Sequence, residues 1–250
     1  MAICQEMLPD YQLITAIESG CLDEFNEAVN RGATTAARDF NGRGVLEIAM
    51  RRGRQDMARR LIRDGADPNG AVGKRGDRLI HLASRTGNIG FLTILLDAGV
   101  DPNTTGNSRR TALHHVVKEK YEFMARILLD HHANPDATDD QGNTPLHIAA
   151  AKGYMPVIRL LLTHHATATI SNNLLYTPIH NAAAEGHTVA VRKLLGHELS
   201  VNPRFESTDI ISRVRRVAEL HGQTETANAL QLTEKGENQP FNCTGAPAPS

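Results

Sequence analysis

The chain contains no tryptophan, and aromatic residues make up only 4% of its 250 residues. A hydrophobic core must therefore be built from small and aliphatic side chains, which suits short, closely packed helices. The three cysteines, Cys4, Cys21 and Cys243, are far apart and form no C-x-x-C pair. This spacing indicates neither a disulfide framework nor a zinc site, and it fits a reducing compartment.

The sequence also lacks a charge excess, with 27 basic residues against 28 acidic ones. This balance argues against a general attraction to nucleic acids or to anionic membranes. No apolar run approaches the roughly 18 residues that a membrane-spanning helix needs. The N-terminus has no basic segment followed by an apolar core, so no secretory signal is expected. We predict a cytoplasmic protein that binds neither nucleic acid nor membrane.

What the chain does have is an internal repeat of about 33 residues. Histidines fall at positions 81, 114, 147 and 180, each 33 residues after the last. A second column of glycines occupies positions 20, 53, 87, 153, 186 and 222, with Lys120 at the place of the missing member. A third column holds loop segments such as DGADPN and AGVDPN. Three columns that share one period indicate a repeat architecture.

One unit, residues 139–171, shows what each repeat predicts. Thr144 is a preferred N-cap and Pro145 fits the first helical position, so a helix is expected from there to Gly153. The segment MPVIRLLLTHH then predicts a second, amphipathic helix, and a polar loop follows it. Two short helices cannot bury an apolar face alone, so consecutive units must stack into a solenoid.

The segment DDQGNTPLHIAAAKGYMPVIRLLL resembles an ankyrin repeat, and the resemblance covers about residues 8–232. It implies an all-α ankyrin-repeat solenoid of about seven helix-turn-helix units, including two caps. The expected units are an N-terminal cap repeat at 8–37, full repeats at 38–71, 72–105, 106–138, 139–171 and 172–205, and a C-terminal cap repeat at 206–232. Residues 233–250 are rich in proline, glycine and polar residues, which predicts a disordered tail.

The periodic histidines invite a catalytic or metal-binding interpretation, but the repeat favours a structural one. At the third helical position, His81, His114, His147 and His180 can hydrogen-bond the capping residue or the adjoining loop. In the ankyrin family, which the chain resembles, the matching histidine is structural. No cofactor and no metal site are expected.

A second set of histidines departs from the pattern. His132 and His165 stand where other repeats have glycine, so left-handed backbone is expected there. Beside them, His131, His164 and His197 form a ladder of residues expected at helix C-termini. Protonation is favourable at such a position by about 0.3–1 kcal/mol, so the ladder is a candidate for slight stabilisation at acid pH. Solvated loop histidines are the alternative.

The resemblance also implies a binding surface made of loop tips and the exposed face of each first helix. Its basic N-terminal half is predicted to contain Arg43, Arg51, Arg52, Lys74, Arg75, Arg85, Arg110 and Lys118. Its C-terminal half contains Leu174 and Tyr176, an unusual apolar pair for a loop. Exposed aromatic and basic residues are typical binding anchors. The alternatives are a solubilising role for the basic residues and loop–loop packing for the other two.

No nucleophile elbow, metalloprotease helix, phosphate-binding loop or kinase motif occurs, so we expect no enzymatic activity. The prediction is a monomeric, non-catalytic protein-protein interaction module that binds a protein partner, with an acidic segment as the expected ligand. The alternative is a secreted bacterial effector that acts on a host protein in the host cytoplasm. A third alternative, a regulatory fragment of a larger enzyme or channel, is less favoured by the cap repeats.

Overall fold

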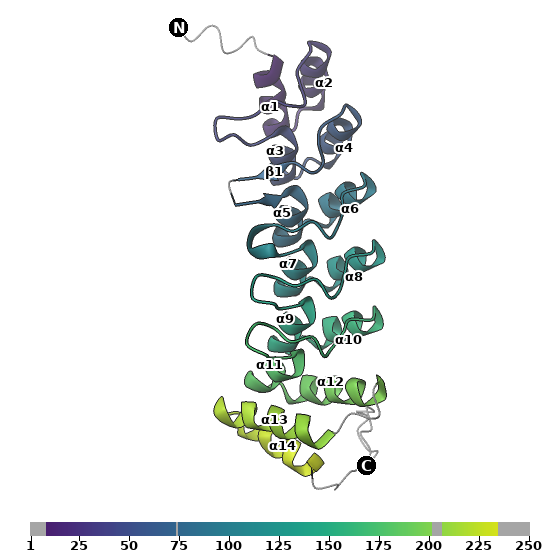
Figure 1. Cartoon of the computed structure of the whole chain (residues 1–250). Coiled ribbons are helices and arrows are strands. Elements are labelled where there is room, and N and C mark those ends of the chain that lie inside the picture. Colours follow the sequence, from purple (N-terminus) through teal and green to yellow (C-terminus); the bar gives the residue numbers. More distant parts are fainter. Residues whose placement is uncertain (1–8, 74, 202–206, 235–250) are drawn as a thin grey trace, which may run out of the picture. The chain divides into compact units, whose positions relative to one another are not determined.

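The computed structural model describes residues 9–73, 75–201 and 207–234, which fold almost entirely into short helices (Figure 1). The chain divides into two compact units, residues 1–145 and 146–250, which are described in turn. No helix within the described residues is long and apolar enough to cross a lipid bilayer.

In the first unit, helices alternate between two packed rows. One row contains α1, α3, α5 and α7, in which each helix packs against the next, and α4, α6 and α8 pack in the same way in the other row. The helices are α1 (Pro9–Ser19), α2 (Leu22–Asn30), α3 (Val45–Arg51), α4 (Gln55–Arg63), α5 (Leu79–Thr86), α6 (Ile89–Asp97), α7 (Ala112–Lys118) and α8 (Glu122–Asp130).

The core between the rows is aliphatic, as the shortage of aromatic residues predicts. α6 buries Phe91, Leu92 and Leu95 on one face, which is the period expected of an amphipathic helix. The side chain of Asn88 caps this helix by accepting a hydrogen bond from the Phe91 N–H (3.2 Å). Gly87, with φ of 71°, ends α5 in the left-handed conformation that glycine tolerates best. The sequence thus marks the end of α5 and the beginning of α6.

The loops of the first unit contain two features that the sequence did not predict. Strands β1 (Ala71–Val72) and β2 (Asp77–Arg78) form a small antiparallel hairpin before α5. A 3₁₀ turn, η1 (Asn107–Arg109), occupies the corresponding place before α7. We expected plain polar loops at both positions.

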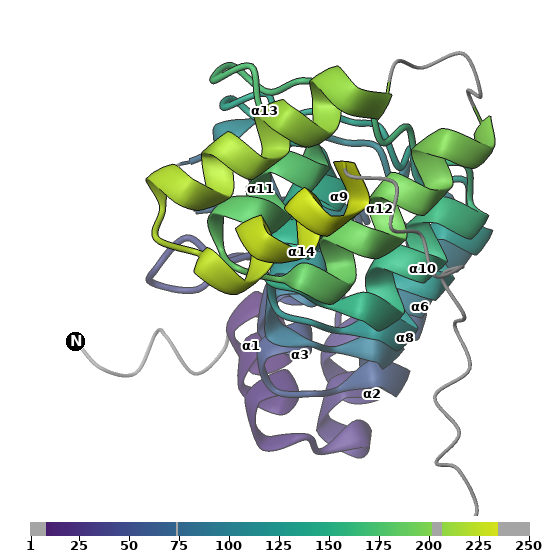
Figure 2. The same ribbon diagram turned by 90° about the horizontal axis from the view of Figure 1, so that it is seen from below.

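The second unit contains α10 (Met155–Thr163), α11 (Pro178–Ala184), α12 (Thr188–Val201), α13 (Ser207–Leu220) and α14 (Thr224–Glu234), and α9 (Pro145–Ala151) lies at the boundary of the two units. α13 packs against α11, and α14 packs against α12 and α13 (Figure 2). The helix-turn-helix units confirm the predicted all-α ankyrin-repeat fold class. α14 continues two residues past the expected start of the tail, and residues 235–250 lie outside the described residues.

Three of the periodic histidines join a first helix to the loop that leads into the next first helix. His114 Nδ1 accepts a hydrogen bond from the Thr111 N–H (3.2 Å), so its proton is on Nε2, which donates to the Asn143 carbonyl oxygen (3.1 Å). Equivalent bonds join His81 Nε2 to Thr104 (2.9 Å) and His147 Nε2 to Tyr176 (2.9 Å). These contacts agree with the predicted structural role.

The departures in the glycine columns have two different outcomes. His132 and His165 have φ of 63° and 61°, which confirms the predicted left-handed conformation, and Lys120 has the same conformation with φ of 63°. His131 and His164 are the C-caps of α8 and α10. His197, in contrast, lies inside α12, which continues to Val201. The expectation that His197 ends a helix is wrong, because residues 197–199 offer no glycine or other residue suited to left-handed backbone.

Candidate functional site: an arginine-lined cleft in the first unit

The first unit contains a cleft of about 740 Å³. Its lining comes from the loop that precedes α3, from the β1–β2 hairpin and from the helices α3 and α5. Five arginines, Arg38, Arg43, Arg51, Arg75 and Arg85, line it together with two carboxylates, Glu47 and Asp77. Three successive repeats contribute, because Asn107 from the third also lines the cleft.

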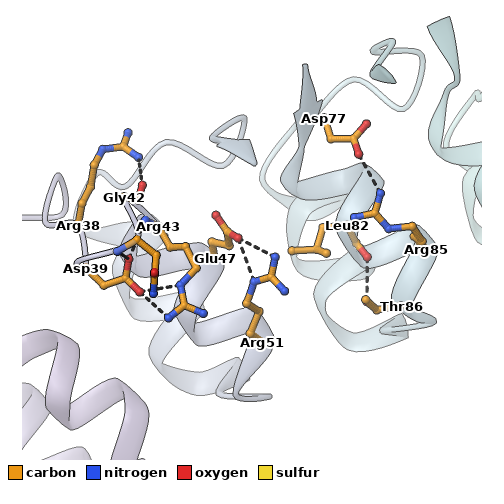
Figure 3. Close-up of polar contacts among 11 residues, drawn as sticks. Arg38, Asp39, Gly42, Arg43, Glu47, Arg51, Asp77, Leu82, Arg85 and Thr86 are labelled. Atoms are coloured by element: carbon orange, nitrogen blue, oxygen red, sulfur yellow. Dashed lines mark hydrogen bonds and ion pairs between the residues drawn. The ribbon is translucent and has the colours of Figure 1, made fainter. Parts of the chain in front are cut away.

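One wall of the cleft is a tight loop organised by Asp39. The Asp39 carboxylate accepts hydrogen bonds from the N–H groups of Asn41 (2.9 Å) and Arg43 (2.8 Å) and forms an ion pair with the Arg43 guanidinium (Figure 3). Burial alone would raise the pKa of Asp39, but these donors hold it below its ordinary value. Arg43 is therefore fixed by its own loop.

Arg51 is held by a carboxylate that replaces one of the periodic histidines. Glu47 occupies the histidine position in α3 and is buried, and Arg51 donates to its Oε1 atom from both Nε and Nη2, each at 2.9 Å (Figure 3). The two residues lie four positions apart on one helix, the spacing at which opposite charges meet. The substitution of His by Glu thus places a guanidinium group at the cleft.

Arg85 is held in a similar way by Asp77 at the base of the hairpin. Arg85 Nη1 donates to Asp77 Oδ2 (2.9 Å), and the Asn107 N–H donates to Asp77 Oδ1 (2.9 Å). Asp77 is 7% exposed, and burial alone would raise its pKa. The hydrogen bonds from Asn107 and Arg85 outweigh this effect and lower it. The hairpin of one repeat is thereby connected to the loop of the next.

Two other arginines of the predicted surface are paired outside the cleft. Arg52 lies 3.1 Å from Glu18 of α1, and Arg110 Nε lies 3.5 Å from the buried carboxylate of Asp139. Five of the eight predicted basic residues therefore have an internal counter-ion. The surface is less basic than the sequence suggests, because these carboxylates neutralise most of it.

The remaining predicted basic residues differ in position. Arg75 lines the cleft, Lys118 lies at the end of α7 outside it, and Lys74 lies outside the described residues. Within the described part of the chain, neither Arg75 nor Lys118 forms an ion pair. Arg38 was not predicted as a site residue, yet it is exposed at the cleft, and its side chain donates to the Gly42 carbonyl oxygen (2.9 Å). Arg38 could have been predicted from the sequence because it directly precedes Asp39, which organises the loop.

In the second unit, the loop at 172–176 presents apolar side chains. Leu174 and Leu175 are each 74% exposed, while Tyr176 is half-buried and stacks on His180 with ring centroids 5.7 Å apart. Asn172 Oδ1 accepts from the N–H groups of Leu174 and Tyr176, both at 3.0 Å, as Asp39 does in its loop. Leu174 and Tyr176 were predicted as binding residues, but Leu175, which extends the exposed apolar tip, was not.

Leu175 also has an unusual backbone conformation. Its φ is 61°, at a position where the equivalent loops contain Gly42 and Gly142, both with φ of 75°. A left-handed conformation costs a non-glycine residue roughly 1–2 kcal/mol. The loop therefore retains a strained leucine whose side chain faces solvent.

His115 is a buried polar group with an incomplete set of partners. It is 8% exposed, its Nε2 atom has no hydrogen-bond partner among the described residues, and its ring meets the His81 ring edge-on at 5.9 Å. Burial, with a smaller effect from His81, lowers its pKa to about 4.

No group of three or more metal-ligating side chains occurs within residues 9–73, 75–201 and 207–234.

Comparisons with known proteins agree with this architecture. A family model described as ankyrin repeats (3 copies) matches residues 80–173 and 132–207. An ankyrin repeat-containing protein of Treponema pallidum (strain Nichols) is 34% identical over 114 residues, which are 46% of this chain and 38% of that protein. The Neurogenic locus Notch protein of Drosophila melanogaster is 40% identical over 57 residues, which are 23% of this chain and 2% of that protein. The matches thus span less than half of either relative.

Among solved structures, the ankyrin repeat domain of Bcl-3, a member of the IkappaB protein family, is similar with a TM-score of 0.69 and 26% sequence identity. The match covers 74% of this chain and 85% of that domain. The histidine-linked helix pairs, the family model and this structural similarity lead to the same conclusion: the chain belongs to the ankyrin repeat family.

Proposed function

We propose that the chain is a non-enzymatic protein-binding module whose first unit binds an acidic segment of a partner protein in the arginine-lined cleft. Ankyrin repeats support a protein-protein interaction module, and the fold is a non-catalytic one. Binding of an acidic segment is supported by the composition of the cleft, which is lined by five arginines and two carboxylates. A cavity lined by an excess of one charge attracts groups of the opposite charge.

The internal ion pairs favour binding, because they fix the arginines before a partner arrives. Arg85 uses Nη1 for Asp77, and a guanidinium group has five N–H donors, so most of its donors are still available to a carboxylate. An unrestrained long side chain loses roughly 0.5–1.5 kcal/mol of conformational freedom on binding. The pairs of Arg51 with Glu47 and of Arg85 with Asp77 reduce this loss.

Arg38 and Arg75 supply the charge that the internal pairs do not neutralise. They lie on the two loops that line the cleft, both are exposed, and neither has an ion-pair partner among the described residues. A partner carboxylate can pair with them without displacing an internal one. These two residues are therefore expected to dominate the electrostatic part of recognition.

The 172–176 loop is a second proposed contact, in the second unit. Leu174 and Leu175 are exposed, and their backbone is fixed by hydrogen bonds to Asn172. A fixed apolar tip can enter a pocket on a partner protein with little loss of conformational freedom. We expect it to contribute affinity, whereas the cleft selects an acidic sequence.

The experiment compares a double charge reversal with a matched control. Arg38→Glu combined with Arg75→Glu changes the cleft, and Arg59→Glu combined with Arg63→Glu makes the same charge change on α4. Each tagged protein is expressed in its native cell, its partners are cross-linked and captured, and the recovered proteins are quantified by mass spectrometry. We expect the cleft variant to lose partners that the control retains. Equal recovery by both variants would contradict the proposal.

A further inference from the structure

The β1–β2 hairpin at the cleft has one backbone edge that is unused. Ala71 pairs with Arg78 and Val72 with Asp77, and the Leu79 N–H donates to the Gly70 carbonyl oxygen (3.1 Å). In an antiparallel ladder, pairs that exchange hydrogen bonds alternate with pairs that do not. The Leu79-to-Gly70 bond places this pair at a hydrogen-bonded position of the ladder, although the Gly70 N–H donates to the Asp67 carbonyl oxygen (3.2 Å). The next pair, Ala71 and Arg78, therefore directs its N–H and C=O groups outward.

The two outer edges of this hairpin differ. On the β2 side, the Arg78 N–H donates to Nδ1 of His81 (3.0 Å), so that edge is occupied by the capping histidine of α5. On the β1 side, Ala71 is exposed, lines the cleft and has no hydrogen-bond partner for its backbone among the described residues. An unpaired strand edge is a template for another extended chain.

We propose that the acidic segment binds in the cleft as an extended strand whose backbone pairs with Ala71, while its carboxylates pair with Arg38 and Arg75. This inference rests on the proposed function and adds the conformation of the ligand. In strand addition, main-chain hydrogen bonds give affinity and alternate side chains give specificity. A helical ligand would already have satisfied its own backbone groups and could not use this edge.

The ligand chemistry follows from this geometry. Side chains two residues apart lie on the same face of a strand, so alternate acidic residues place their carboxylates on one side. The cleft lining supplies cations from both loops, with Arg38 on one and Arg75 on the other. An extended peptide of alternating glutamate and threonine is therefore the simplest ligand that fits.

The test uses a fluorescein-labelled peptide of five Glu-Thr pairs and measures its affinity for the full chain by fluorescence anisotropy. Two isomers carry N-methyl groups, one on the five glutamate amides and the other on the five threonine amides, so each blocks one edge of the strand. We expect one isomer to bind like the parent peptide and the other to bind about 3- to 10-fold more weakly, the effect of losing one hydrogen bond. Parent-like affinity of both isomers would overturn strand addition.

Variants of the protein provide the second arm. Ala71→Pro removes the N–H group of the edge and is expected to weaken the parent peptide to a similar degree, with circular dichroism used to verify folding. If Ala71→Pro disrupts the hairpin, the N-methyl isomers still decide the question with the unmodified chain.

The peptide measurements also separate this inference from the proposed function. Loss of binding in the Arg38→Glu, Arg75→Glu variant, together with equal affinity of the two isomers, would support an acidic ligand but overturn the extended conformation. A glutamate peptide that binds the unmodified chain no better than a lysine-threonine peptide would overturn both.

Discussion

The Oδ1 atom of Asp77 lies 2.6 Å from the position that a Cβ atom would take at Gly106. Two of the equivalent loops begin with Asp39 and Asp139, each of which accepts hydrogen bonds from the backbone of its own loop. At Gly106 that side chain is missing, and Asp77 from the preceding repeat accepts the Asn107 N–H instead. The φ of Gly106 is −106°, so glycine is needed there for space rather than for its backbone conformation.

Gly106→Ala is therefore expected to destabilise the fold. The new methyl group would overlap Asp77 and the His81 ring, a steric conflict that costs about 1–3 kcal/mol. Chemical denaturation measures the change in the free energy of unfolding. Gly196→Ala is the control, because no atom lies within 4 Å of the added Cβ, and it should be neutral or slightly stabilising. In an Asp77→Ala background the cost should fall, and an unchanged cost would contradict this explanation.

Leu175→Gly is expected to stabilise the second unit by about 0.5–1 kcal/mol. The substitution relieves the left-handed conformation of a leucine that is 74% exposed and so loses little packing. The reciprocal change, Gly42→Leu, introduces the same strain at an unobstructed position and should destabilise by about 1 kcal/mol. Thermal unfolding of both variants checks the pair. A lower melting temperature for Leu175→Gly would show that the leucine contributes to folding.

Acid should remove the stability that two buried histidines contribute to the fold. Burial lowers the pKa of His115 and of His180 from 6.5 to about 4. Because the unfolded chain then takes up protons first, this stability is present above pH 6.5 and is lost as the pH falls toward 4. Each histidine is expected to lower the free energy of unfolding by on the order of 1–2 kcal/mol between pH 7 and pH 5. Burial raises the pKa of Glu198 to about 7, which acts in the opposite direction between pH 7 and pH 5. Denaturation therefore compares the change in stability between these pH values in the unmodified chain and in His115→Leu, and an equal change in both would refute the expectation.

The sign of this pH effect is opposite to that expected of the helix-terminal ladder. Burial and the nearby Lys193 lower the pKa of His197, so protonation of this residue is unfavourable. The prediction of acid stabilisation is therefore wrong for His197. Its position inside α12, away from the helix terminus, removes the favourable interaction on which that prediction depended.

His115→Leu should raise stability at both pH values. Ile48 and Leu82 occupy the same position in the two preceding repeats, and His115 leaves a buried Nε2 atom without a partner. Removing an unsatisfied buried polar atom while keeping an apolar side chain is expected to stabilise by about 1 kcal/mol. The same variant should reduce the stability difference between pH 7 and pH 5. Destabilisation by the leucine would indicate that His115 has a structural partner.

The fold could be predicted from the sequence because each repeat carries its own local signals. Thr111 and His114 mark the beginning of a first helix, and Lys120 takes the left-handed position at its end. The pairings of Arg43 with Asp39 and of Arg51 with Glu47 were also visible, since each pair lies four residues apart. We predicted Arg43 and Arg51 without these partners and so overestimated the positive charge of the surface.

Other features depend on tertiary contacts within and between repeats, which a single period does not reveal. Arg85 meets Asp77 only because the hairpin folds back over α5, and Asp77 meets Asn107 only because Gly106 leaves room. The edge of Ala71 depends on the register of a two-residue strand. These parts of the candidate site arise where the sequence departs from the repeat pattern.

The histidine bonds have a consequence for engineering this chain. His81 donates to the carbonyl group of Thr104 and His114 to that of Asn143, so the conformation of each loop depends on a side chain of the first helix that precedes it. A loop transplanted without this helix would lose the histidine hydrogen bond that fixes its conformation. Recombination of binding loops should therefore use segments that begin at the preceding capping histidine, so that donor and acceptor move together.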